Sequence, residues 1–290
     1  MSSIRTLSIY GLSAVIAALL PILVLPILAN TMGPQDFGLF TAARFTMQLA
    51  CFFVGSFLGF GLSRVFFDRT PEAYYGLING ANLTTLGLGL ILFWVATVGF
   101  SGTDLPDDQP IITVICTIFV GAVGFVWRQN YHRILVMISR AGLAASTEVF
   151  FNALIFGGFL LLSWLGFGWV AMLGVQAAIF VVTAFISACI IAYLVGTKGM
   201  MSLDVDWTLQ NFRRSGPFIV VGLVTPLLLT IDKYIIAAVL GAEQMGVYAS
   251  TAMYLSKNSI SDVKFKGTPA AVNKPGKKRA TTRKRAKAKT

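Results

Sequence analysis

The run WVAMLGVQAAIFVVTAFISACIIAYLV, residues 169–195, contains no charged side chain. A helix needs about 20 mostly apolar residues to cross the roughly 30 Å hydrocarbon core of a bilayer, so the run predicts a transmembrane helix. The whole chain shares this character, because 56% of its 290 residues are hydrophobic and 12% are charged. Soluble domains carry about 25% charged residues, so the composition argues against a soluble enzyme.

Apolar runs of similar length recur on both sides of this stretch. The connections between them are short and carry turn residues such as Gly33-Pro34 and Thr70-Pro71. We predict eight membrane spans, at residues 8–31, 39–62, 78–100, 111–127, 146–164, 169–195, 216–240 and 247–263. The predicted fold class is therefore all-α, a polytopic bundle of transmembrane helices.

The placement of Lys and Arg predicts the orientation of the chain, since cytoplasmic loops retain positive charge. With the N-terminus in the cytoplasm, nine cations fall in inside connections: Arg5, Arg64, Arg69, Arg128, Arg133, Arg140, Lys198, Arg213 and Arg214. No cation falls in an outside connection, where the acids Asp36, Asp104, Asp107, Asp108 and Glu243 lie. This asymmetry predicts a cytoplasmic N-terminus.

A repeat with an offset of 208 residues divides the chain. Residues 33–40, GPQDFGLF, match residues 241–248, GAEQMGVY, with glycine at both ends of the shared Gly-x₄-Gly unit. The charge map places an even number of crossings between the copies, as a parallel repeat requires. We therefore predict a first six-helix lobe over 1–195, a cytoplasmic connection over 196–215 and the start of a second lobe over 216–263.

The C-terminal stretch differs from the rest of the chain. From Lys264 to Thr290 there are eleven Lys or Arg residues and no acid. Such a tract predicts a disordered basic tail over 264–290, which would contact anionic lipid at the inner surface. We expect no nucleic-acid partner, because Pro, Gly, Ala and Thr dilute the cations and Phe265 is the only aromatic residue among them.

Two segments resemble a known family of membrane proteins. Tyr10-Gly11-Leu12-Ser13, a proline-containing first helix and the pattern Leu-Ala-x₃-Gly-Pro-x-x-Phe-Gly-Leu-Phe over residues 28–40 resemble the start of bacterial polysaccharide flippases. These belong to the superfamily that includes the multidrug and toxic-compound extruders. Residues 232–236, followed by Leu240-Gly241 and residues 246–249, resemble the start of that family's second half.

The resemblance implies a function in the bacterial cytoplasmic membrane. It implies flipping of undecaprenyl-pyrophosphate-linked sugar units from the cytoplasmic to the outer leaflet, with membrane lipid and a lipid-linked glycan as partners. Family members have two complete lobes, whereas this chain departs from the family pattern after about residue 255. We therefore expect a truncated or frame-shifted product.

Arg44 is the first candidate for a binding residue, because an ionised group at membrane depth is costly and so marks a functional site by default. At 100° per residue, Arg44, Gln48, Cys51, Gly55 and Gly59 share an arc of about 80° on one helix. Bulky residues such as Phe45 and Phe53 lie on the other side, which we expect to face lipid. The pattern predicts that Arg44 and Gln48 face an internal cavity, where the guanidinium would bind a diphosphate. A structural ion pair, or a side chain that reaches the outer surface, is the alternative.

Other ionisable residues form a second group of candidates. Lys233 could bind the phosphate of the substrate, Asp232 could carry a coupling ion, and Lys257 would join them if the last span forms. Mutual charge compensation is the alternative for Asp232 and Lys233. We expect Glu148, near the inner interface, to be a solvated or helix-start acid.

The substrate class follows from the charge at membrane depth. Arg44, Lys233 and Lys257 outnumber Asp232 there, which favours an anionic cargo over a cationic drug. A cation-coupled multidrug exporter of the same fold and a non-transporting membrane fragment remain as alternatives. The three cysteines are far apart and no nucleotide-binding motif is present, so we expect no metal, no cofactor and no ATP-binding module.

Overall fold

A computed structural model describes residues 3–65, 70–100, 111–138, 141–197 and 203–251. Within these ranges the chain forms helices and no strand, which confirms the predicted fold class. Lys257, the connection 101–110, the tail 264–290 and most of the predicted span 247–263 lie outside the described residues.

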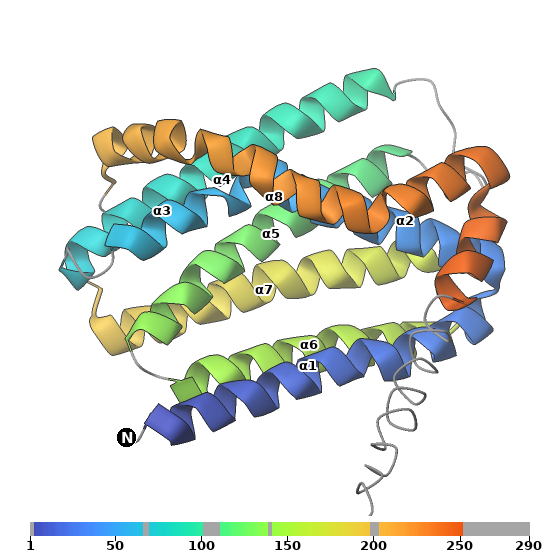
Figure 1. Ribbon diagram of the computed structural model, residues 1–290, viewed down its shortest axis with the longest axis horizontal. Coiled ribbons are helices and arrows are strands. Elements are labelled where there is room, and N and C mark those ends of the chain that lie inside the picture. The colour runs from blue at the N-terminus through green and yellow to red at the C-terminus, as the bar shows by residue number, and fades with distance from the viewer. Residues whose placement is uncertain (1–2, 66–69, 101–110, 139–140, 198–202, 252–290) are drawn as a thin grey trace, which may run out of the picture. The chain divides into compact units, whose positions relative to one another are not determined.

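The helices follow one another with short connections (Figure 1). They are α1 (Ser3–Met32), α2 (Pro34–Cys51), a π-helical turn η1 (Phe52–Ser56), α3 (Leu58–Val65), α4 (Pro71–Gly99), α5 (Ile111–Met137), α6 (Ala141–Trp164), α7 (Trp169–Val195) and α8 (Val205–Leu240). Residues 242–251 are also helical.

Six helices in the described part of the chain are long and apolar enough to cross a membrane. Their candidate spans are Gly11–Met32, Pro34–Ser56, Ala73–Gly99, Ile111–Val136, Gly142–Trp164 and Trp169–Val195. These correspond to the first six predicted spans. The helix α8 is not among them, so its predicted crossing stays a prediction.

Close helix pairs build the interior of the bundle. Figure 1 shows α5 beside α7 and α1 beside α6, the two most extensive helix contacts. Gly124 lets α5 and α7 approach closely, since a Cβ at this position would lie 2.9 Å from the backbone nitrogen of Val181. Large side chains such as Phe40 and Phe159 are fully buried, while Trp94 and Phe185 are exposed on the outside, as lipid contact requires.

The second predicted span is not one continuous α-helix. After Cys51 the chain passes through η1 before α3 resumes, and Gly55 in this turn has a φ of 138°, a conformation that glycine adopts readily. A Cβ on Gly55 would lie 2.7 Å from Oγ1 of Thr85, so the turn also lets α4 approach closely. The break therefore introduces a kink between α2 and α3.

The helix α5 is longer than the predicted span 111–127, and this changes the charge map. The sequence places Arg128 and Arg133 in an inside connection after residue 127, whereas both lie in α5, within the candidate span Ile111–Val136. The charged residues are accommodated inside the helix because neighbouring elements surround them.

The two copies of the repeat have the same local structure. In each, a long helix ends at a glycine with positive φ, 80° at Gly33 and 88° at Gly241, and a new helix begins at once. The Phe37 amide donates to the Gly33 carbonyl at 3.1 Å, and the Met245 amide donates to the Gly241 carbonyl at 3.2 Å. Phe37 and Met245 occupy equivalent positions, and both are buried.

The copies also contact each other reciprocally. A Cβ on Gly38 would overlap the Ala242 carbonyl and lie 3.1 Å from the Gly246 nitrogen. A Cβ on Gly246 would overlap the Pro34 carbonyl and lie 3.1 Å from the Gly38 nitrogen. Such paired contacts are those of a local pseudo-two-fold axis, which agrees with the repeat read from the sequence. The division into two lobes stays a prediction.

Candidate functional site

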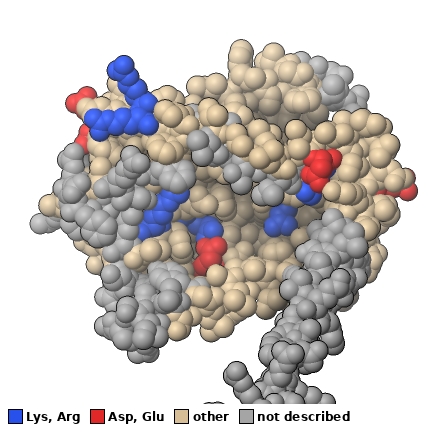
Figure 2. Space-filling model, viewed as in Figure 1, with Lys and Arg blue, Asp and Glu red and all other residues tan. Residues whose placement is uncertain are grey.

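A polar cavity of about 250 Å³ lies among α2, α5, α6 and α7. Figure 2 shows Lys and Arg atoms, with a group of Asp or Glu atoms, along a hollow on one face of the molecule. The polar residues that line the cavity are Arg44, Gln48, Arg128, Gln129, Glu148, Asn152 and Gln176. Aromatic side chains, among them Phe125, Phe151 and Phe156, form much of the remaining wall.

Arg44 projects from α2 into this cavity, as the sequence predicts. Its Cζ lies 5.4 Å from the ring centroid of Phe156 and 6.0 Å from that of Phe159, so the guanidinium rests against aromatic faces. Its Nε is buried without a hydrogen-bond partner among the described residues. Neither of the ion pairs in the described part of the chain involves Arg44, so its positive charge has no carboxylate partner there.

Gln48 lines the same cavity one helical turn after Arg44. The structure therefore brings these two predicted residues together on one face of α2, with Cys51 next along it. The arc of residues predicted to face the cavity does not continue to Gly59, because Gly59 packs against Arg133. A Cβ at Gly59 would overlap the guanidinium of Arg133, so Gly59 makes room for this arginine.

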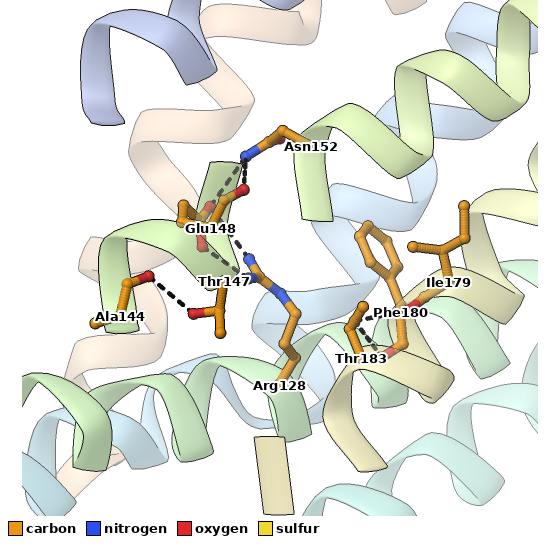
Figure 3. Close-up of polar contacts among 8 residues, drawn as sticks. All are labelled: Arg128, Ala144, Thr147, Glu148, Asn152, Ile179, Phe180 and Thr183. Carbon is orange, nitrogen blue, oxygen red and sulfur yellow. Dashed lines mark hydrogen bonds and ion pairs between the residues drawn. The ribbon is translucent and has the colours of Figure 1, made fainter. Parts of the chain in front are cut away.

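The cavity also contains an ion pair that the sequence did not predict (Figure 3). Arg128 of α5 donates from Nη1 to Oε2 of Glu148 on α6 at 2.7 Å, and from Nη2 to Oε1 at 3.4 Å. Nδ2 of Asn152 donates to Oε1 of Glu148 at 3.3 Å. The expectation of a solvated or helix-start acid is therefore incomplete, because the partly exposed carboxylate also compensates a buried arginine.

A sequence signal for this pair was present. Glu148 lies inside the predicted span 146–164, and a carboxylate at membrane depth requires a partner. The separation of 20 residues and the unknown rotation of the two helices left that partner unidentified.

Asp232 and Lys233 lie on α8, and neither lines the cavity of Arg44. Lys233 Nζ lies 3.4 Å from Oδ1 of Asp232, and the Tyr248 hydroxyl donates to Oδ2 of Asp232 at 2.6 Å. Lys233 Nζ also lies 5.1 Å from the ring centroid of Phe45, so this partly buried ring meets α8, and its predicted contact with lipid stays a prediction. The charge compensation considered from the sequence is present, and the predicted binding and coupling roles stay predictions.

The described residues contain no group of three or more His, Cys, Asp and Glu side chains that could hold a metal ion. What the cavity offers is one arginine without a carboxylate partner, a second arginine held by Glu148, and several amide side chains. This set donates hydrogen bonds in excess and suits an anionic, oxygen-rich ligand.

The family described as polysaccharide biosynthesis protein matches residues 3–260 of the chain, which covers all the described helices. No curated protein and no solved structure matches the chain.

Proposed function

Because the chain belongs to the polysaccharide biosynthesis protein family, we propose that it flips undecaprenyl-pyrophosphate-linked glycan units across a bacterial cytoplasmic membrane. The family and the six membrane-compatible helices identify a multi-pass membrane protein of polysaccharide transport. The lipid-linked form of the cargo and the direction, from the cytoplasmic to the outer leaflet, are the proposed part.

The observation that carries the proposal is the position of Arg44. It lies ten residues after the start of α2, which at 1.5 Å per residue is about 15 Å along the helix. This is about half of the hydrocarbon thickness of a bilayer. An arginine without a carboxylate at such a depth favours an anion in the cavity, and its planar fork of donors matches the oxygens of a diphosphate.

A cytoplasmic N-terminus, which the distribution of Lys and Arg predicts, would agree with the proposed direction. Arg128 and Arg133 no longer count as loop residues, but the other seven of the nine cations lie outside the six candidate spans. By the same criterion Asp36 lies inside the candidate span Pro34–Ser56, so among the described acids Glu243 is the one that remains in a predicted outside connection. In this orientation the Arg128–Glu148 pair lies toward the cytoplasmic end of α5, and Arg44 lies deeper.

An ion gradient is the proposed source of energy. Asp232 is the carboxylate that we propose to carry the coupling ion, since it already accepts hydrogen bonds from Tyr248 and Lys233 and can exchange one of them. Lys233 and Lys257 are proposed to contact the cargo phosphate at another step of the cycle.

The proposal is tested by replacing Arg44 with alanine. We expect R44A to reduce flipping of an undecaprenyl-pyrophosphate-linked oligosaccharide in proteoliposomes by about 10- to 100-fold. This corresponds to the loss of one or two charge-assisted hydrogen bonds. The matched control is R213A, which removes an exposed arginine of α8 outside the cavity and should leave flipping unchanged.

Membrane insertion is measured alongside, from the amount of each variant recovered in the lipid fraction. Normal flipping by a well-inserted R44A variant would refute the assignment. If cells that express R44A lose drug resistance while glycan export stays intact, the result would instead indicate the alternative function, a multidrug exporter.

A further inference from the structure

The Arg128–Glu148 pair lines the same cavity as Arg44, yet binding by Arg44 makes no use of it. We propose that Arg128 is a second cargo-binding residue, and that Glu148 occupies its guanidinium until the diphosphate of the cargo replaces the carboxylate. The inference rests on the proposed function, because it extends the diphosphate site of Arg44 to a second helix.

The geometry of the pair is that of an anion site already filled. Both terminal nitrogens of Arg128 point at the two oxygens of one carboxylate, at 2.7 Å and 3.4 Å (Figure 3). Two oxygens of a phosphate group accept from an arginine in the same forked arrangement. Glu148 therefore holds the place that a phosphate of the cargo would take.

Arg128 is held in position by contacts that do not depend on Glu148. Its Cζ lies 3.6 Å from the ring centroid of Phe151, and 5.7 Å from that of Phe125. Its Nε is buried without a hydrogen-bond partner among the described residues, so one donor is not used by the carboxylate. The guanidinium can thus keep its place while its anionic partner changes.

Glu148 is the more accessible member of the pair. The exposed fraction of its side chain is 31%, against 7% for Arg128. Asn152 donates to Oε1 of Glu148 and would continue to do so after the carboxylate leaves Arg128. Exchange of one anion for another also never leaves Arg128 buried and uncompensated, which is the costly state for such a pair.

A structural pair that only ties α5 to α6 is the competing explanation, and binding measurements separate the two. The probe is inorganic pyrophosphate, titrated by calorimetry into the full chain in lipid nanodiscs. Glu148→Gln keeps the shape of the side chain but removes the competing charge, so we expect pyrophosphate to bind at least tenfold more tightly. Glu148→Asp keeps the charge and withdraws it by one methylene group, so a smaller gain is expected.

Two further variants show whether the gain acts through Arg128. In the double variant R128Q/E148Q the gain should disappear, because the second guanidinium is gone. The matched control is E243Q, since Glu243 is an exposed acid outside the cavity and its replacement should not change binding. Thermal denaturation of each variant verifies that it is folded.

Each outcome decides the inference. Unchanged or weaker binding by folded E148Q and E148D, while R44A still weakens binding, would overturn the role of Arg128 and leave the proposed function standing. A gain that persists in R128Q/E148Q would also overturn it. If neither the native chain nor any variant binds pyrophosphate, both the inference and the diphosphate site of Arg44 fail.

Discussion

The two copies of the repeat share a backbone but not a charge pattern. In both, a long helix with two prolines, Pro21 and Pro26 in α1 and Pro217 and Pro226 in α8, ends at a positive-φ glycine and a second helix follows. The first copy places Arg44 in a polar cavity. The second places Asp232 and Lys233 beside each other on its long helix.

Counting back 208 residues makes the difference specific. The positions equivalent to Asp232 and Lys233 are Val24 and Leu25, and Val24 is buried. The position equivalent to Tyr248 is Phe40, which packs edge-on against Phe159 at 5.1 Å. The two copies therefore share the glycines that the helix junction requires, whereas their ionisable residues differ. Shared backbone geometry is thus no guide to which residues bind.

The reciprocal glycine contact is the strongest test of the shared geometry. Gly38→Ala and Gly246→Ala should each destabilise the protein by about 1–3 kcal/mol, because each added methyl group meets a backbone carbonyl that cannot turn aside. The double variant should cost less than the sum, since one separation of the helices relieves both overlaps. The measurement is the free energy of unfolding from an SDS titration in mixed micelles.

The control for this pair is Gly157→Ala, because a Cβ on Gly157 of α6 meets no atom within 4 Å. It should be neutral or slightly stabilising. If one of the variants Gly38→Ala and Gly246→Ala lost much stability and the other none, the contact between the two glycines would not be reciprocal.

The two positive-φ glycines should give a smaller effect of equal size. Alanine at Gly33 or at Gly241 places a Cβ in a positive-φ backbone conformation that costs an L-residue about 1–3 kcal/mol. The same SDS titration measures the loss. Gly174→Ala, in the regular part of α7 with free space around it, is the matched control. Unequal losses at Gly33 and Gly241 would show that the two junctions are not equivalent.

Tyr248→Phe sharpens the contrast between the copies and should have the smallest effect. It makes the second copy resemble the first at this position and removes the hydrogen bond to Asp232. Because the contact is solvent-exposed, we expect only a small loss in the free energy of unfolding, below that of a buried hydrogen bond. Tyr193→Phe, which removes the hydroxyl of an exposed tyrosine on α7, should cost nothing measurable. An equal loss in both variants would mean that the contact with Asp232 contributes nothing of its own.

Much of the fold could be predicted from residue patterns. Long uncharged runs such as 169–195 identify helices because a bilayer leaves the backbone no other partner for its polar groups. The repeat was visible because Gly33, Gly38, Gly241 and Gly246 each meet a backbone requirement that few other residues satisfy. Arg44 was found because its charge contradicts the apolar run around it.

The remaining features depend on three-dimensional packing. The turn at Gly55 needs no proline, and from the sequence this glycine reads as one more small residue on the cavity face. Arg128 was assigned to a loop because a charged residue usually ends an apolar span. Its place in α5 follows from Glu148 and Phe151, which lie on another helix. How each helix is rotated about its axis decides such contacts, and hydropathy carries little of that information.

The cation–π contacts of Arg44 affect how quickly the cavity can bind an anionic ligand. A ring face attracts a cation by about 0.5–2 kcal/mol without neutralising it. Phe156 and Phe159 therefore steady the guanidinium and leave its charge undiminished, so an arriving anion need not evict a resident one. We expect the anionic cargo to bind first at Arg44. Little conformational entropy is lost there, because the side chain is already ordered by the two rings.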